Sequence, residues 1–272
     1  MEKEKIVLPG KLAALMIPLY CRAFESKKKS PIIYDAKAVA MVNSIDFDFQ
    51  KLLIPRQTYV TLCLRAKQFD DYVRKYLQAN AESVVLHLGC GLDSRFERVD
   101  NQLVEWYDLD FPEVIELRRK FFQETDRYHL LPSPVMELSW LGRIKNKNKP
   151  AIILAEGLFM YLKEAELKKL LFALQEQFPG SILVFDAFSE AAAKGVNSHP
   201  SLIRTGAQVT WGLNQAGEIE QWQQGFRLIE EWFFSQSGEI EKLGLSYQLL
   251  FKVAHLFPAA RNAHRLLVFQ LG

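Results

Sequence analysis

Short apolar runs alternate with amphipathic stretches between residues 83 and 186, and this alternation constrains the fold more than any other feature of the chain. The apolar runs predict strands at residues 83–88, 103–110, 128–131, 151–155 and 181–185, the last ending at Asp186. Three- and four-residue spacing of apolar side chains predicts helices at residues 57–80, 111–122 and 163–178. Strands that alternate with helices at this spacing predict an α/β fold with a doubly wound, mostly parallel sheet.

The rhythm breaks after residue 188, where residues 189–225 show no regular period. Two late strands are predicted at residues 227–234 and 264–271, around a helix at residues 245–255. We therefore expect one domain over residues 1–272, with a helical extension (1–80), a ligand-binding core (81–188), a cap (189–225) and the last two strands (226–272). An insert after the fifth strand lies at the carboxyl end of the sheet, where folds of this class bind ligands.

Composition excludes several classes of protein. Thirty-four Lys and Arg against 32 Asp and Glu leave a formal charge of +2, which argues against binding nucleic acid by bulk electrostatics. No apolar run approaches the ~18–20 residues of a membrane span, and the charged N-terminus does not resemble a signal peptide. The three scattered cysteines lack CxxC spacing, so we expect reduced thiols in a cytoplasmic protein and no metal site.

A glycine-containing turn follows the first predicted core strand, where Gly89 and Gly91 flank Cys90. Glycines at this point let the backbone approach a ligand closely. A dinucleotide fingerprint needs a third glycine three positions after Gly91, and that position holds Ser94. The turn therefore predicts a nucleoside site without a pyrophosphate cradle.

Acidic and basic side chains occupy positions that suit such a ligand. Asp110 ends the second predicted strand, where a carboxylate commonly binds ribose hydroxyls. Asp108 competes for this role, and Asp110 could instead cap the following helix. Glu156 follows the fourth strand, and Arg65 lies on or beside the apolar stripe of the helix at 57–80, where it needs either an internal carboxylate or a ligand anion. Together, Glu156 and Arg65 would suit the ammonium and the carboxylate of an amino-acid tail.

Three segments resemble the leucine carboxyl methyltransferase family, and within it the bacterial O-methyltransferases of the tetracenomycin polyketide type. They are LGCGLDSR at residues 88–95, WYDLDFP at 106–112 and AEGLFMYL at 155–162. They stand in the family's order and spacing, and the resemblance runs from about Arg22 to the last residue. It implies a seven-stranded, Rossmann-like class I methyltransferase fold that uses S-adenosyl-L-methionine (SAM) and releases S-adenosyl-L-homocysteine (SAH).

The resemblance also implies roles for individual residues. The family's cofactor-binding positions fall on Lys28 (within the lysines at 27–29), Arg65, Gly89, Gly91, Asp110, Val135 through its backbone, and Glu156. A tyrosine near the transferred methyl falls on Tyr161, although this ring could equally be a packed aromatic.

The implied activity is O-methyl transfer to a hydroxyl or carboxylate of a small molecule such as a polyketide or another aromatic metabolite. Among the histidines, His199 in the cap is the candidate base, whereas His87, His129 and His264 fit structural roles. Trp211 is a candidate acceptor contact, with burial in the core as the alternative. The alternatives are a protein C-terminal carboxyl methyltransferase, a tRNA-modifying relative, a nicotinamide-dependent oxidoreductase and a SAM-binding protein without catalysis.

Overall fold

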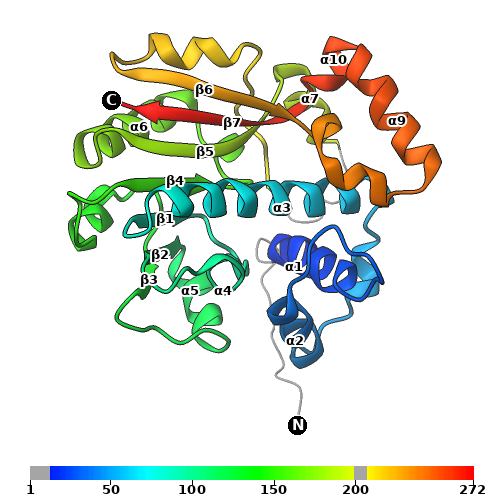
Figure 1. Ribbon diagram of the computed structural model, residues 1–272, viewed down its shortest axis with the longest axis horizontal. Coiled ribbons are helices and arrows are strands. Elements are labelled where there is room, and N and C mark those ends of the chain that lie inside the picture. The colour runs from blue at the N-terminus through cyan, green and yellow to red at the C-terminus, as the bar shows by residue number, and fades with distance from the viewer. Residues whose placement is uncertain (1–12, 199–206) are drawn as a thin grey trace.

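The structure, a computed structural model, describes residues 13–198 and 207–272. At its centre is a seven-stranded sheet in the order β3-β2-β1-β4-β5-β7-β6 (Figure 1). Strands β1 to β5 pair in parallel, and β7 runs antiparallel to both β5 and β6. The strand order reverses between β1 and β4, which is where doubly wound sheets bind their ligands.

The predicted strands are all present. Their bounds are β1 Val84–Leu88, β2 Glu105–Asp110, β3 Tyr128–Pro132, β4 Ala151–Ala155, β5 Ser181–Phe188, β6 Phe226–Phe233 and β7 His264–Leu271. The fifth strand is longer than predicted, because Ala187 and Phe188 continue its pairing with β7. Asp186 therefore lies within β5, where it pairs with Leu266 of β7.

The α-helices are α1 Ala13–Glu25, α2 Ala36–Ser44, α3 Arg56–Ala79, α4 Arg95–Val99, α5 Pro112–Arg119, α6 Glu164–Gln177, α7 Glu190–Val196, α9 Leu245–Leu256 and α10 Pro258–Arg261. Single 3₁₀ turns are η2 Phe49–Leu52, η3 Leu138–Arg143, η4 Phe159–Tyr161, η5 Ala216–Gln221, η6 Phe234–Gln236 and η7 Gly238–Lys242. The helix predicted at 111–122 stops at Arg119, and the segment predicted to be irregular contains α7 and η5.

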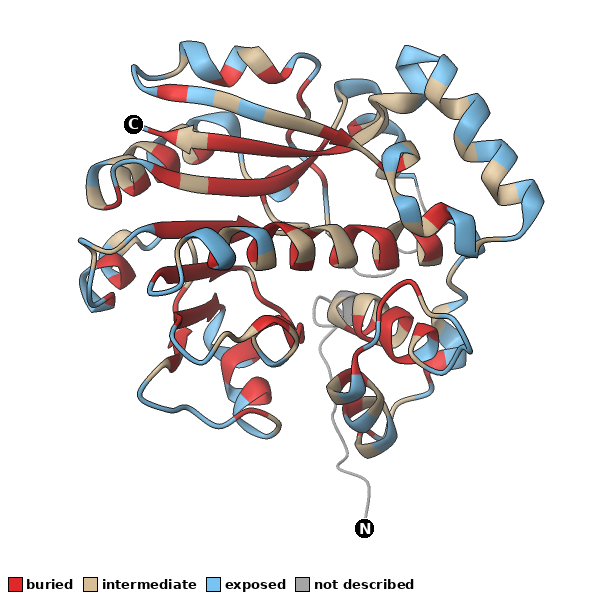
Figure 2. Cartoon of the chain, in the orientation of Figure 1, coloured by how far each residue is buried: buried red, intermediate tan, exposed pale blue. Residues whose placement is uncertain are grey.

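Helices cover both faces of the sheet, and the side-chain alternation of the strands divides the core into two layers. Val85 of β1 packs with Phe69 and Val73 of α3 on one face. Its neighbour Leu86 packs on the other face with the leucines of α6, among them Leu170. This two-residue period is what a central strand buried on both faces requires, and Figure 2 shows β1, β4 and β5 as mostly buried.

Two parts of the chain flank the carboxyl end of the sheet (Figure 1). Helices α1 and α2 pack against each other, and α1 also packs against α3, on one side. On the other side, α9 and α10 connect β6 to β7, and no residue of α9 is buried. No helix among the described residues is long and apolar enough to cross a membrane.

Candidate functional site

The turn after β1 has the conformation expected of a ligand cradle. Gly89 and Gly91 both adopt positive φ, at 63° and 51°. A Cβ atom at Gly89 would lie 3.0 Å from a methyl group of Leu158, and one at Gly91 would lie 3.2 Å from a methyl group of Leu15 on α1. Both positions therefore require glycine, for backbone conformation and for space.

Asp110 ends β2 beside this turn. One carboxylate oxygen accepts the N–H of Gly91 at 2.7 Å, and the other accepts the N–H of Phe111 at 2.8 Å. The helix-cap alternative is wrong, because Phe111 occupies the N-cap of α5 and no side chain caps it. A carboxylate has about four lone-pair positions, so two backbone bonds orient Asp110 and leave acceptor capacity for ribose hydroxyls. Burial raises the pKa of Asp110, and the two backbone bonds oppose that rise.

Asp108, the competing ribose ligand, is already saturated. It accepts bonds from Trp106 Nε1 at 2.8 Å and Tyr128 Oη at 2.5 Å, and it contacts His87 and Arg118. Burial favours the neutral acid, but Arg118 and His87 outweigh it and lower the pKa of Asp108 to about 2. Asp108 is therefore a structural anion, and Asp110 is the available carboxylate.

Arg65 and Glu156 contact each other at the carboxyl end of β4. Arg65 Nε donates to Glu156 Oε1 at 2.9 Å, and Nη1 donates to Asp186 Oδ2 at 2.9 Å. Of the two partners considered for Arg65, the internal carboxylate is therefore observed. Its third nitrogen, Nη2, makes no hydrogen bond within the described residues and lies 3.2 Å from the position that a Cβ of Gly157 would occupy.

Gly157 and Asp186 belong to this site and were not predicted. Gly157 has φ 64° and donates its N–H to Asp186 Oδ1 at 2.6 Å. A side chain at Gly157 would contact the guanidinium of Arg65. The sequence held a signal for each residue. Gly157 directly follows Glu156, and Asp186 stands at the predicted end of the fifth strand.

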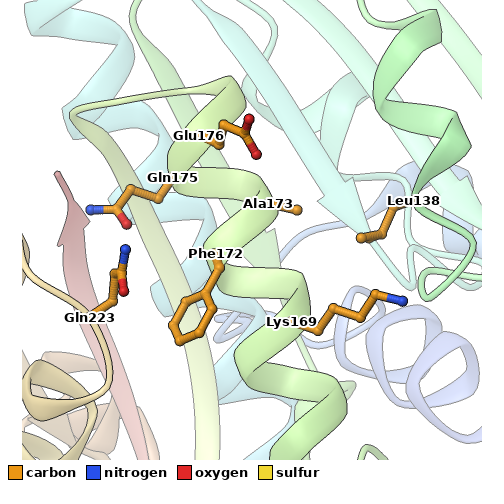
Figure 3. A pocket seen from close by; sticks show the side chains of 7 residues that line it. All are labelled: Leu138, Lys169, Phe172, Ala173, Gln175, Glu176 and Gln223. Atoms are coloured by element: carbon orange, nitrogen blue, oxygen red, sulfur yellow. The ribbon is translucent and has the colours of Figure 1, made fainter.

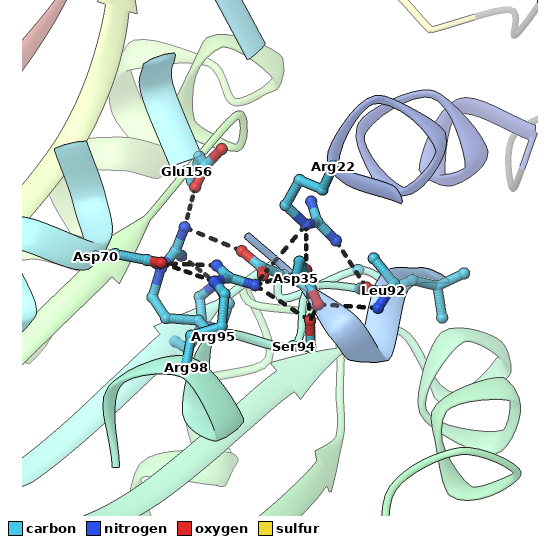
Figure 4. Close-up of polar contacts among 12 residues, drawn as sticks. Arg22, Asp35, Asp70, Leu92, Ser94, Arg95, Arg98 and Glu156 are labelled. Atoms are coloured by element: carbon cyan, nitrogen blue, oxygen red, sulfur yellow. Dashed lines mark hydrogen bonds and ion pairs between the residues drawn. The ribbon is translucent and has the colours of Figure 1, made fainter. Parts of the chain in front are cut away.

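A buried ionic network underlies the turn (Figure 4). Arg95 and Arg98 of α4 both contact Asp70 of α3, and Arg95 also contacts Glu156 at 2.5 Å. Arg98 reaches Asp35, which in turn binds Ser94 and Arg22 of the N-terminal segment. The network therefore connects α1, α3 and α4 with Glu156 after β4. It also holds the loop after β1, because Arg22 bonds to the Leu92 carbonyl.

The other predicted residues have different surroundings. Lys28 pairs with Glu25 at 2.6 Å and lies 4.8 Å above the ring of Tyr59. The carbonyl of Val135 accepts Trp140 Nε1 at 3.0 Å, while its N–H makes no hydrogen bond within the described residues. Tyr161, the last residue of η4, is 40% exposed, and desolvation raises its pKa. His199 lies outside the described residues.

The acceptor role considered for Trp211 is not supported. Trp211 is 6% exposed and packs in the core layer with Phe185 and Trp222. The alternative, a core residue, is therefore the observed one, because its ring has no free face for a ligand. A separate hollow on the outer side of α6 holds none of the predicted residues (Figure 3). Cys21, Cys63 and Cys90 are free and buried.

Comparison with known sequences identifies the family of the chain. A model of the leucine carboxyl methyltransferase family matches residues 16–175. The polyketide synthesis O-methyltransferase TcmP of Streptomyces glaucescens is 32% identical, and the match covers 97% of this chain and 98% of TcmP. The SAM-dependent methyltransferase dpfgK of Gibberella zeae is 28% identical over 86% of this chain and 85% of its own. These relatives are named methyltransferases, so the nicotinamide-dependent alternative is not supported.

Solved structures show the same fold at low sequence identity. A DUF574 family protein from Streptomyces avermitilis superposes with a TM-score of 0.60 at 13% identity, covering 95% of this chain and 97% of that chain. The plantazolicin methyltransferase BpumL, crystallised with SAH and a substrate analogue, gives a TM-score of 0.51 at 13% identity, covering 96% of this chain and all of its own.

The donor set also fits SAM in charge and shape. The turn at Gly89 and Gly91 has no side chain that would obstruct a nucleoside. The Asp110 carboxylate is held by two backbone bonds and can accept ribose hydroxyls. Arg65 and Glu156 carry the two charges that suit an ammonium and a carboxylate. The chain is a SAM-dependent O-methyltransferase with the class I fold, and it belongs to the leucine carboxyl methyltransferase family.

Proposed function

We propose that this enzyme methylates an oxygen atom of a small aromatic acceptor that binds at the carboxyl ends of β4 and β5, beside the start of β7. The observation that carries the proposal is the convergence of Asp110, Arg65 and Glu156 around the turn at Gly89 and Gly91. The relationship to TcmP, a polyketide O-methyltransferase, supports an aromatic acceptor.

Each cofactor-binding residue has a distinct role in this proposal. Asp110 accepts hydrogen bonds from the ribose, and the free N–H of Val135 is available to an adenine nitrogen. Arg65 presents Nη2 to the carboxylate of the methionine part, and Glu156 accepts its ammonium. Lys28, which the family resemblance also implies as a cofactor ligand, pairs with Glu25, so we assign it no contact with the cofactor.

SAM supplies an already activated methyl group, so the protein contributes alignment and exclusion of water. The acceptor oxygen must lie in line with the methyl group and the sulfur, and positioning of this kind accounts for several kcal/mol of barrier reduction in enzymes. Tyr161 is the exposed aromatic side chain that directly follows the Glu156–Gly157 segment, and we assign it to the wall between the cofactor and the acceptor.

Calorimetric titration with SAM tests the cofactor assignments. Asp110→Ala and Glu156→Gln should each weaken binding by roughly 10- to 150-fold, which corresponds to one hydrogen bond to a charged group. Asp71→Asn, on the exposed side of α3, is the control and should bind SAM like the unmodified protein. Binding of SAM by both site variants with unchanged affinity would refute the assignment.

The acceptor class is tested with radiolabelled methyl groups. Label in a small aromatic product supports the proposal. Base-labile label on protein in a lysate would instead support the alternative of a protein carboxyl methyltransferase.

A further inference from the structure

Asp186 is a fully buried carboxylate beside the residues assigned to the cofactor. Ala155 of β4 pairs with Phe185 of β5, and the next residues along these parallel strands are Glu156 and Asp186. The backbone N–H of Gly157 donates to Asp186 Oδ1 at 2.6 Å. Asp186 therefore lies at the junction of two parallel strands, at the edge of the sheet where this fold class binds ligands.

Donors from three separate parts of the chain hold this carboxylate. Besides the N–H of Gly157 on Oδ1, Oδ2 accepts from Arg65 Nη1 of α3 at 2.9 Å and lies 2.7 Å from Nε2 of His264, which opens β7. Burial favours the neutral acid, but Arg65 and His264 outweigh it and lower the pKa of Asp186. An ionised carboxylate only accepts hydrogen bonds, so we assign the ring proton of His264 to Nε2. The sequence predicted a structural role for His264, and this contact holds Asp186 from the β7 side.

Asp186 in turn fixes one edge of the Arg65 guanidinium. Glu156 binds Nε and Asp186 binds Nη1, each at 2.9 Å. Burial disfavours the charged guanidinium, but Asp186 and Glu156 raise the pKa of Arg65, so it stays a cation. A guanidinium is planar and presents its N–H donors in a fixed geometry. Once Nε and Nη1 are held, the direction in which Nη2 points is therefore also determined.

Gly157 leaves the space next to Nη2 without a side chain. A Cβ atom at Gly157 would lie 3.2 Å from Nη2, 3.4 Å from Nη1 and 3.5 Å from Cζ of Arg65. The guanidinium could move away from such an atom only by lengthening its bonds to Glu156 and Asp186. Gly157 therefore acts twice, because its N–H orients Asp186 and its lack of a side chain leaves Arg65 in place.

We propose that Asp186 and Gly157 are positioning residues that orient Arg65 toward the carboxylate of the amino-acid tail of SAM. The inference rests on the proposed role of Arg65 as the ligand of that carboxylate. Affinity for the tail then depends on two residues to which we assign no contact with the cofactor. Affinity for the nucleoside does not depend on them, because the ribose ligand Asp110 is held by the separate backbone bonds from Gly91 and Phe111.

Positioning and simple charge neutralisation predict opposite effects when the charge of Asp186 is removed. An anion that only neutralises Arg65 weakens its attraction for a ligand carboxylate, so its loss would strengthen binding. An anion that positions Arg65 has the reverse effect. If Asp186→Asn keeps its oxygen toward the N–H of Gly157, its amide nitrogen faces the donors of Arg65 and His264. The guanidinium then loses the bond that orients it, and binding of the tail weakens.

Calorimetric titration of the full-length protein with two ligands tests the proposal without turnover. SAH and 5′-methylthioadenosine share the adenosine and the thioether, and only SAH has the amino-acid tail. Asp186→Asn should weaken binding of SAH by roughly 10- to 150-fold, the equivalent of one hydrogen bond to a charged group, and leave the affinity for 5′-methylthioadenosine unchanged. Gly157→Ala should show the same selective loss. Unchanged or tighter binding of SAH by Asp186→Asn, or equal losses for the two ligands, would overturn the proposal.

Asp108→Asn provides the matched control. Asp108 is a buried strand aspartate like Asp186, and it also contacts one arginine and one histidine, Arg118 and His87. It makes no contact with the residues assigned to the tail within the described part of the chain. Asp108→Asn should therefore change the affinities for SAH and 5′-methylthioadenosine by the same factor. A selective loss of SAH in this control would show that any buried carboxylate has the effect, and it would refute a specific role for Asp186.

Arg65→Gln separates a failure of this inference from a failure of the proposed function. If Arg65→Gln weakens SAH no more than 5′-methylthioadenosine, Arg65 is not the ligand of the tail and the proposed cofactor assignment is wrong. If Arg65→Gln shows the selective loss and Asp186→Asn does not, only the positioning role is wrong. In the double variant, Asp186→Asn should add no further loss of SAH affinity, because no guanidinium is left to orient. If thermal melting shows that Asp186→Asn does not fold, Gly157→Ala decides, and equal effects on the two ligands in that variant would overturn the proposal.

Discussion

Asp70 offers the sharpest test of how the buried charges hold this fold together. Its side chain is fully buried on α3 and accepts bonds from Arg95 Nε at 2.8 Å, Arg98 Nε at 2.7 Å and Arg98 Nη2 at 2.9 Å. Asp70→Asn keeps the shape but removes the charge and turns an amide donor toward guanidinium donors. Two buried cations then lose a common anion.

The expected cost follows from that geometry. Removing one partner of a buried ion pair destabilises a protein by about 3–5 kcal/mol, and here Arg95 and Arg98 both lose a carboxylate partner while Arg95 keeps Glu156 and Arg98 keeps Asp35. For a chain of this size, with roughly 2–4 °C of melting temperature lost per kcal/mol, the thermal midpoint should fall by roughly 6–20 °C. Urea and thermal unfolding of the protein without ligand measure both quantities.

The next residue on the same helix provides the control. Asp71 pairs with Lys67 and Arg74, but its side chain is 40% exposed. Because water screens such pairs, Asp71→Asn should cost only about 0–1 kcal/mol. If the two asparagine variants lose stability equally, burial of the network does not determine its contribution and the reasoning fails.

Three further predictions concern the site. Because burial raises the pKa of Asp110, acidification should weaken SAM binding at a pH above the ordinary aspartate range of ~3.9, and calorimetry should show no such pH dependence in Asp110→Asn. Gly91→Ala should lower the free energy of unfolding by about 1–2 kcal/mol, because Gly91 has a left-handed backbone conformation. Gly142→Ala, which has no atom near the Cβ position, is the control and should change the stability in urea little. Equal effects of the two changes would contradict the strain argument. Tyr161→Phe should lower kcat roughly 2- to 13-fold, the equivalent of one hydrogen bond, and leave the SAM dissociation constant unchanged. Tyr34→Phe, at an exposed tyrosine, is the control. An unchanged kcat in Tyr161→Phe would show that the Tyr161 hydroxyl takes no part in the transfer step.

The sheet was predictable because its signals are local. Runs such as residues 151–155 are apolar throughout, and the α3 stripe of Phe69 and Val73 repeats at helical spacing. Both patterns depend only on nearby residues, so they appear in the sequence without knowledge of the partners.

A helical extension over residues 1–80 was expected, but the bounds of α1 and α2 were not predicted, and neither was α4, where charged side chains are buried. Arg22, Asp35 and Arg95 are all buried, yet each suggests an exposed position when it is read alone. Their neutralising partners are distant in the chain, as with the 63 positions between Asp35 and Arg98. In α4, a helix of five residues, only Arg95 and Val99 are buried, which is too short a pattern to show helical periodicity.

The candidate site was also predictable only where its signals are local. Glu156 and Asp110 follow strand ends, where the fold class itself marks ligand positions, and the family motifs agree with them. Asp186 and His264 are 78 positions apart, and only the antiparallel pairing of β5 with β7 brings them together. Pairings of this range cannot be inferred from spacing in one sequence.

The bridge from Arg22 and Asp35 to α4 has a consequence for the order in which the protein matures. Ribosomes release the N-terminal helices first, but the groups that compensate them, the Leu92 carbonyl and Arg98, are synthesised some 60 to 70 residues later. Until α4 has been made, Arg22 and Asp35 have only each other as partners among these groups, and a chain that starts at α3 would leave the Leu92 carbonyl and Arg98 without the contacts that these two residues make. The segment from the turn after β1 to α4 is therefore not an independent module, because Arg22 and Asp35, which are translated first, supply hydrogen bonds and ion pairs to Leu92, Ser94 and Arg98.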